Sequence, residues 1–207
     1  MEKNEQHDAR NFQMIKPNQY LLIIALLAIN ISCGYIPQVY QYNDPLTAEE
    51  HNNLGVAYEK EGNLDLALKE YEKSVKKDSN LVTPLVNIGN IYLKKNQLDK
   101  AEKYYLRALA MDEYNIGAAN NLANVYLKMN DKYSEGIEYL SNAVKKQGQP
   151  SVYALDTLSE LYIRSGQIAE AKKILEGLCI STHGMELHKA VEENLKLIDE
   201  PDCSKQP

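Results

Sequence analysis

A self-similarity with a period of 34 to 36 residues limits what this chain can fold into more than any other feature. Four tyrosines recur at spacings of 34, 34 and 36 residues: Tyr58, Tyr92, Tyr126 and Tyr162. Each is preceded by an apolar residue four positions earlier and a small residue three positions earlier: Leu54, Ile88, Leu122, Leu158 and Gly55, Gly89, Ala123, Ser159. A fixed period of about 20–50 residues indicates a repeat architecture whose units stack on one another.

Each unit is predicted to hold two amphipathic helices. A second set of small residues is spaced 34, 35 and 35, with a large residue four positions after each: Ala67, Ala101, Gly136, Ala171 and Tyr71, Tyr105, Leu140, Leu175. In the second unit, apolar residues at i, i+3/i+4 and i+7 predict helices at about residues 83–95 and 99–111. The extra residues fall within Met129–Glu135 and near Gln147–Ser151, which are loop-like segments where insertions are tolerated. Tyr92 is expected inside the array.

This pattern resembles the tetratricopeptide repeat over residues 48–182, although the tryptophan frequent in that family is replaced by His51, Leu85, Ala119 and Leu155. The resemblance implies an all-α fold, a right-handed superhelical stack of four helical hairpins. Their expected bounds, within residues 47–182, are about 48–81, 82–115, 116–150 and 152–182. Residues 183–200 are expected to form a capping helix, because its apolar residues lie on one stripe: Met185, Leu187, Val191, Leu195 and Ile198. Residues 201–207 are expected to be a disordered tail.

The N-terminal 33 residues differ in kind from the repeats. The run from Tyr20 to Ile31 carries no charge, and 12 apolar positions suit the central region of a signal sequence better than a membrane span of about 20. Ser32-Cys33 at its end resembles the cleavage site of bacterial lipoproteins, which implies lipidation of Cys33. The match departs from the family at Asn30, where leucine is preferred. The alternative is an uncleaved signal anchor from Tyr20 to about residue 36.

Both interpretations place the repeats on the same side of the membrane. Lys3, Arg10 and Lys16 precede the apolar run, and no Lys or Arg follows before Lys60, so the N-terminus stays in the cytoplasm. We therefore expect a membrane-anchored protein of the cell envelope with an extracytoplasmic, periplasmic repeat domain. A buried helix of a soluble protein would leave the charge asymmetry unexplained. Residues 34–46 are expected to be an extended linker, because they contain two prolines.

Catalytic, metal-binding and nucleic-acid-binding patterns are not found in the sequence. The net charge of −6 disfavours a nucleic-acid partner. The three cysteines are too few and too unevenly spaced for a disulfide scaffold or a zinc site, and Cys179 is expected as a small buried residue. Cys203 falls in the polar tail. We expect no enzyme activity, no cofactor, no metal and no small-molecule substrate.

Two sets of polar residues recur on the predicted first helices. The asparagines are Asn53, Asn87 and Asn121, joined by Asn90 and Asn124. In superhelical tetratricopeptide arrays such as that of O-linked N-acetylglucosamine transferase, a similar asparagine ladder lines the concave groove and holds a peptide backbone. The resemblance implies that role here, with the alternative that asparagine is common at these positions in any copy of the repeat.

The second set is a row of cations at spacings of 34, 34 and 36: Lys60, Lys94, Lys128 and Arg164. Either they offset the dipole at each helix end, by about 0.3–1 kcal/mol, or they favour an acidic segment or a C-terminal carboxylate. The clamp of chaperone-binding members is not matched, because Val56, Gly117 and Asn121 occupy its places.

These features predict a protein–protein interaction scaffold held at the membrane by its N-terminus, with a partner peptide or protein in the concave groove. Resemblance to small tetratricopeptide lipoproteins implies a role in assembling or regulating an envelope machine. Two alternatives remain at this point. One is a self-assembling structural module, and the other is a non-catalytic accessory subunit of an envelope enzyme complex.

Overall fold

The computed structural model describes residues 44–148, 151–181, 187–198 and 203. The predicted signal or anchor segment at residues 1–33, the lipidated Cys33 and most of the 34–46 linker lie outside the described residues. So does the tail at 201–207, apart from Cys203. Within the described ranges, no helix combines the length and the hydrophobicity needed to cross a membrane.

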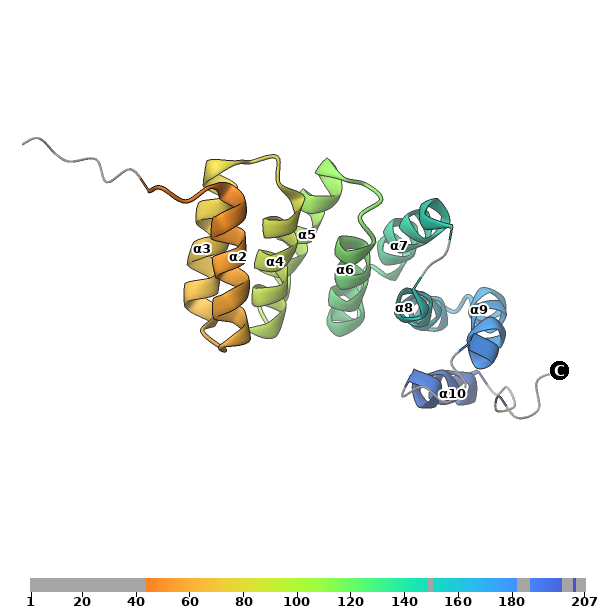
Figure 1. Ribbon diagram of the computed structural model, residues 1–207. Helices are drawn as coiled ribbons and strands as arrows, with labels where there is room; N and C mark the ends of the chain where they lie inside the picture. Colours follow the sequence, from red (N-terminus) through yellow and green to blue (C-terminus); the bar gives the residue numbers. More distant parts are fainter. Residues whose placement is uncertain (1–43, 149–150, 182–186, 199–202, 204–207) are drawn as a thin grey trace, which may run out of the picture. The chain divides into compact units, whose positions relative to one another are not determined.

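The repeats are helical hairpins that follow one another along the stack (Figure 1). The pairs are α2 (Ala48–Lys60) with α3 (Leu64–Lys77), α4 (Val82–Lys94) with α5 (Leu98–Met111), α6 (Ile116–Met129) with α7 (Tyr133–Gln147), and α8 (Val152–Arg164) with α9 (Ile168–Ser181). A last helix, α10 (Leu187–Leu197), packs on α9 and α8. The predicted all-α fold of stacked hairpins is confirmed.

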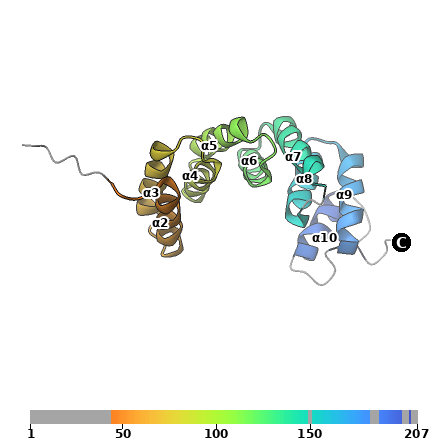
Figure 2. The same ribbon diagram turned by 45° about the horizontal axis from the view of Figure 1, so that its top comes forward.

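The first helices of successive hairpins lie close to one another. Helix α4 contacts α6, and α6 contacts α8, while α3, α5 and α7 occupy the other side of the stack (Figure 2). The first helices therefore share one face, and the side chains that recur on them are brought into register.

The turn inside each hairpin depends on a residue that accepts a positive φ. Gly62, Asn96, Asn130 and Gly166 have φ angles of 81°, 55°, 53° and 79°. Glycine and asparagine tolerate this left-handed region, which other side chains rarely enter. In the third hairpin, Lys132 also has a positive φ of 54°. The extra residue predicted within Met129–Glu135 is thus accommodated in the turn.

Close approach of the two helices in a hairpin depends on a ring packed over a glycine. A Cβ placed on Gly55 would lie 2.5 Å from Cε1 of Tyr71, and a Cβ on Gly89 would lie 2.5 Å from Cε1 of Tyr105. Both tyrosines are fully buried. The third and fourth hairpins replace the tyrosine by a buried leucine, and there the glycine is replaced by Ala123 and Ser159. Glycine thus occurs opposite the larger tyrosine ring, and alanine or serine occurs opposite the smaller leucine.

The expectation for Tyr92 needs correction. Its side chain is only half-buried, and its ring stacks on Tyr104 with 5.5 Å between centroids. The ammonium of Lys100 lies 5.2 Å from the same ring. Tyr92 therefore lies at the edge of the core, against α5 of its own hairpin. The enclosed tyrosines are Tyr71, Tyr105 and Tyr126, and Tyr126 is the counterpart of Tyr92 in the third hairpin.

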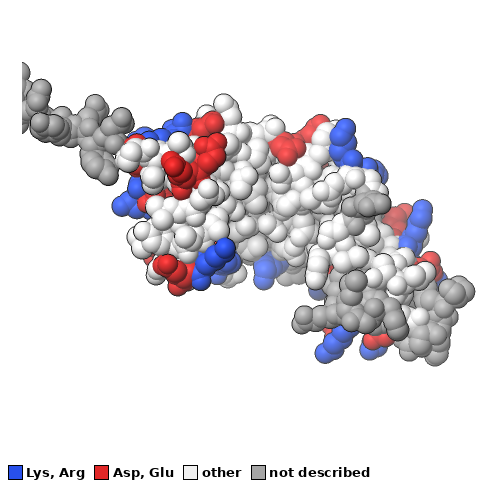
Figure 3. Space-filling model, viewed as in Figure 1, with Lys and Arg blue, Asp and Glu red and all other residues white. Residues whose placement is uncertain are grey.

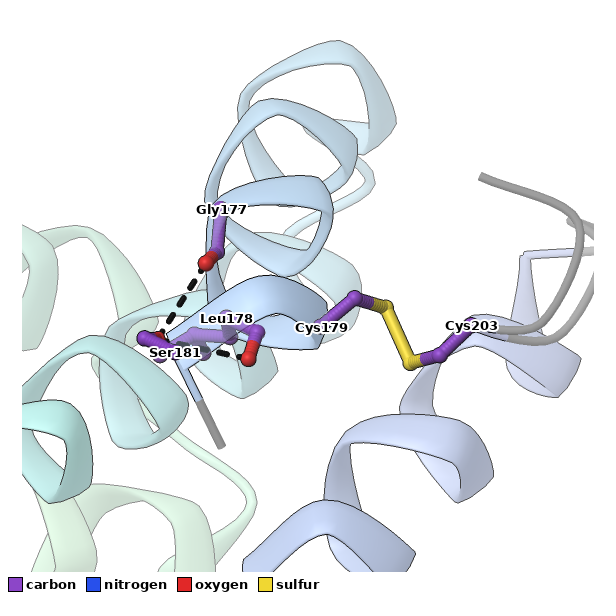
Figure 4. Close-up of a disulfide and its surroundings, with 5 residues drawn as sticks. All are labelled: Gly177, Leu178, Cys179, Ser181 and Cys203. Atoms are coloured by element: carbon purple, nitrogen blue, oxygen red, sulfur yellow. Dashed lines mark hydrogen bonds between the residues drawn. A yellow bond between two sulfur atoms is a disulfide. The ribbon is translucent and has the colours of Figure 1, made fainter. Parts of the chain in front are cut away.

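The C-terminal end of the stack is covered by α10. Its residues Val191 and Leu195 are buried together with Leu178 and Cys179 of α9. Cys179 forms a disulfide with Cys203, 24 residues later, with 5.3 Å between the Cα atoms (Figure 4). Cys179 is buried as expected, but its pairing with Cys203 was not predicted. Cys203 lies beside α9, and the Cα separation is within the usual range of about 4.4–6.8 Å.

The ring-over-glycine contact predicts a compensating pair of substitutions. Gly89→Ala should lower the free energy of unfolding by about 1–3 kcal/mol, because its methyl group meets the buried Tyr105 ring. Adding Tyr105→Leu should remove the clash and recreate the pairing of the third hairpin. Urea unfolding of both single variants and the double variant measures the coupling. Additive effects in the double variant would contradict the assignment.

Candidate protein-interaction surface

The middle of the shared face, formed by α4 and α6, is poor in charge. Helices α4 and α6 each carry a single charged side chain, Lys94 and Lys128, in the last turn. Figure 3 accordingly shows an uncharged area between patches of charged side chains, in a view that faces α2, α4 and α6. Polarity on this face comes from side-chain amides. We name this set the amide row: Asn52, Asn53, Asn87, Asn90, Asn120, Asn121 and Asn124.

Hydrogen bonds within the amide row join successive repeats. Asn87 Nδ2 donates to Asn52 Oδ1 at 2.9 Å, which links α4 to α2. Asn121 Nδ2 donates to Asn90 Oδ1 at 2.8 Å, which links α6 to α4. The same Asn90 oxygen accepts a hydrogen bond from the hydroxyl of Tyr105 at 2.7 Å. The asparagines therefore stabilise the stacking of the repeats as well as lining its face.

Amide groups in the row retain capacity for further hydrogen bonds, since each offers two N–H donors and a carbonyl oxygen. Asn124 Nδ2 donates to the backbone carbonyl oxygen of Asn120 at 2.9 Å. Asn120 Oδ1 is buried and accepts no hydrogen bond within the described part of the chain. Bonds inside the row hold the amides in fixed orientations, which reduces the entropy lost when a partner binds.

The predicted asparagines do not all occupy equivalent places. Asn87, Asn90, Asn121 and Asn124 are half-buried, whereas Asn53 is exposed. Asn53 lines a shallow pocket of about 220 Å³ between the starts of α2 and α4, together with Asn52 and Thr83. Asn52 and Asn120 were not among the predicted site residues. The signal that could have identified them is the doubling of asparagine at 52–53 and 120–121.

The row of cations is partly neutralised by glutamates that also lie on first helices. Lys94 Nζ lies 2.7 Å from Glu59 Oε1 on the preceding repeat, and Arg164 lies 3.4 Å from Glu160. Lys60 and Lys128 are exposed. These ion pairs lower the net positive charge that a partner would meet along the row.

One carboxyl group at the C-terminal end of this face is in an unusual state. Asp156 stands on α8 at the repeat position that Asn52 and Asn120 occupy in other hairpins. Burial raises the pKa of Asp156 to about 6, with a further contribution from the charge of Glu160. Asn194 Nδ2 of α10 donates to Asp156 Oδ1 at 3.2 Å. The cap thus contacts the end of the row.

Metal chemistry has no visible basis on this face. Among the residues that the structure describes, no cluster of three or more His, Cys, Asp or Glu side chains could hold a metal ion. The arrangement of amides offers hydrogen-bond donors and acceptors to a polar chain.

Comparison with known proteins agrees with the repeat pattern. Two family models, both described as tetratricopeptide repeat, match residues 46–113 and 86–149, which together make just over half of the chain. No curated protein matches the sequence.

Several solved structures share the fold at low sequence identity. YrrB, described as a TPR protein with an unusual peptide-binding site, is 19% identical, with 76% of this chain and 81% of that chain covered and a TM-score of 0.62. Pseudomonas aeruginosa pilF is 20% identical, with 78% and 73% covered and a TM-score of 0.64. The second TPR domain of human RPAP3, solved in complex with the HSP70 peptide SGPTIEEVD, is 20% identical, with 55% and 93% covered and a TM-score of 0.50.

The raised pKa of Asp156 predicts a pH-dependent contribution to stability. Because its pKa is about 6 in the fold and 3.8 as the ordinary value, folding favours the neutral carboxyl. The contribution is complete below about pH 4 and is lost as the pH rises through about 6. Asp156→Asn should therefore reduce the fall in unfolding free energy between pH 4 and 7, measured by urea unfolding. The exposed Asp99→Asn serves as control, and parallel curves for wild type and Asp156→Asn would contradict the assignment.

Proposed function

This chain belongs to the tetratricopeptide repeat family, and we propose that it is a membrane-tethered scaffold that binds an extended segment of a partner protein on its amide row. Members of this family are generally non-catalytic protein–protein interaction modules. The observation that carries this proposal is the amide-lined face of α4 and α6, where each helix has a single charged side chain in its last turn. The partner lies along the first helices, with its backbone facing the asparagines.

An amide is well suited to hold a peptide backbone. It matches the donor and the acceptor of a peptide unit without reading the side chains of the partner. A surface that binds its partner through positive charge would require cations without acidic neighbours. Here Lys94 is paired with Glu59, and Arg164 with Glu160. Hydrogen bonding by the amide row is therefore favoured over the cation row as the main source of affinity.

Relatives of the same fold support binding of peptides by such a stack. YrrB is described with a peptide-binding site, and the RPAP3 domain was solved with an HSP70 peptide. This chain carries Val56, Gly117 and Asn121 at the places of the chaperone clamp. For that reason the proposed partner is not a chaperone tail.

The scaffold works at a bacterial cell envelope in this proposal, tethered by its N-terminus, with the repeats on the periplasmic side. The support is the apolar run from Tyr20 to Ile31 and the Ser32-Cys33 junction, which lie outside the described residues. The Cys179–Cys203 disulfide adds support, because disulfides persist in oxidising compartments. The role is to assemble or regulate an envelope machine.

The first test locates the bound partner. A photo-crosslinking residue at Asn53, which is exposed in the amide row, should capture a partner from membranes. The same residue at the exposed Lys103 of α5 should not. Light scattering of the repeats should give the mass of a monomer, and a higher mass would instead support self-assembly. A catalytic subunit as the captured protein would favour the accessory-subunit role.

Titration of that partner should then separate the two sets of groove residues. Replacing Asn87 and Asn121 by Ala should weaken binding at low and high salt, by about 0.5–1.5 kcal/mol for each lost hydrogen bond. Replacing Lys94 and Lys128 by Gln should have a smaller effect. Urea unfolding of each variant checks that the stack is retained. Unchanged affinity in the asparagine variant, with the fold intact, would exclude the amide row.

The tether has a separate test. If Cys33 is lipidated, a fatty-acid probe should label the wild type, and Cys33→Ala should block both processing and labelling. Cys203→Ser, which breaks the Cys179–Cys203 disulfide but keeps Cys33, should still be processed and labelled. No label on the wild type, with equal mass for wild type and Cys33→Ala, would leave the uncleaved signal anchor as the form of attachment.

A further inference from the structure

The second helices of the two middle hairpins carry an aromatic residue at an equivalent position. Three residues after the small residue stand Tyr104 in α5 and Tyr139 in α7, whereas α3 has Glu70, which is hydrogen-bonded to His51, and α9 has Ile174. In the second hairpin, the Tyr104 ring stacks on Tyr92 of the first helix, with 5.5 Å between centroids and 23° between the planes. In the second hairpin, this position is therefore filled by a ring that lies over the tyrosine of the first helix.

The missing ring coincides with a cleft in the fourth hairpin. Helix α8 contacts both α7 and α9 (Figure 2). Between them lies a cavity of about 390 Å³, whose apolar lining residues are Val144, Leu155, Leu158, Tyr162 and Ile174. Tyr162 corresponds to Tyr92 in the repeat, and it is half-buried. The volume falls at the lower end of the about 300–1,000 Å³ of ligand sites.

The rim of the cleft carries more positive than negative charge. Lys145 of α7 and Lys173 of α9 are exposed and line it, with one acid, Glu170. The chain as a whole has a net charge of −6. A locally cationic rim on an acidic protein selects a partner with acids next to its apolar anchor.

We propose that this cleft binds a partner segment that places an aromatic side chain over Tyr162 and acidic residues beside it against Lys145 and Lys173. The aromatic side chain takes the position that the Tyr104 ring holds over Tyr92 in the second hairpin. Aromatic pairs in such geometry add attraction beyond the area they bury. The cleft lies among α7, α8 and α9, so this site is separate from the amide row and independent of the function proposed for it.

The test uses a fluorescein-labelled synthetic peptide, Gly-Glu-Asp-Tyr-Asp-Glu-Gly, titrated with the full chain and followed by fluorescence anisotropy. Binding should saturate below about 1 mM. A peptide with Ala in place of Tyr, and one with Lys in place of the acids, should each bind at least about tenfold more weakly. Equal binding of the three peptides, or no binding of the first, would overturn the proposal.

Variants of the protein test the position. Ile174→Tyr fills the cleft with the residue of the second and third repeats and should weaken peptide binding at least about tenfold while leaving the fold intact. The matched control, Ile180→Tyr, adds the same ring at a site that is 75% exposed on the same helix and should bind as the wild type. Wild-type affinity in Ile174→Tyr, or equal losses in both variants, would contradict the site.

Two further measurements keep the result decisive. Should Ile174→Tyr fail to fold, Lys145→Glu with Lys173→Glu changes only exposed residues, and unchanged affinity in this variant would overturn the proposal. Sedimentation of wild type and Ile174→Tyr tests whether the occupant is a second copy of the chain. If the wild type is a dimer and Ile174→Tyr is a monomer, the occupant of the cleft is a second copy of the chain, and the proposal is refuted.

Discussion

Everything in this molecule depends on the fact that a helical hairpin cannot bury its own apolar face. Within a hairpin, the two helices come close because a ring lies directly over a glycine, as Tyr71 does over Gly55 and Tyr105 over Gly89. The rest of the apolar surface is buried only when the next hairpin stacks on it. The stacking aligns the first helices, and this alignment turns a sequence period into a continuous face.

The amide row shows how stacking and binding use the same side chains. Asn87 and Asn121 each donate to an asparagine of the preceding repeat, so they help set the spacing of the hairpins. Asn90 also satisfies the hydroxyl of the buried Tyr105. Substitution at Asn90 therefore disturbs the core and the face together. For binding, the useful consequence is that the amides are held in place before a partner arrives.

The C-terminal end follows a different logic from the interior of the stack. The last hairpin has no successor, and α10 covers it with Val191 and Leu195 while the disulfide returns Cys203 to α9. This cover also reaches α8, where Asn194 contacts Asp156 and helps enclose a carboxyl group whose pKa is about 6. The fourth hairpin thus has three features of its own. Its first helix carries Asp156, it is covered by α10, and it lines the cleft beside Ile174.

Local sequence determined the fold class, the period and the positions of the helices, because each depends on spacing along one chain. The tyrosines, the small residues and the asparagines of the first helices were all visible as recurrences of 34 to 36 residues. What only the tertiary structure decided depends on how repeats meet. Three such contacts join residues on different helices. Asn87 bonds to Asn52 and Lys94 pairs with Glu59. Tyr92 stays half-buried beside Tyr104. The pairing of Cys179 with Cys203 likewise depends on the position of Cys203 beside α9 in the folded chain. A period in the sequence records which residues repeat and not which of them touch.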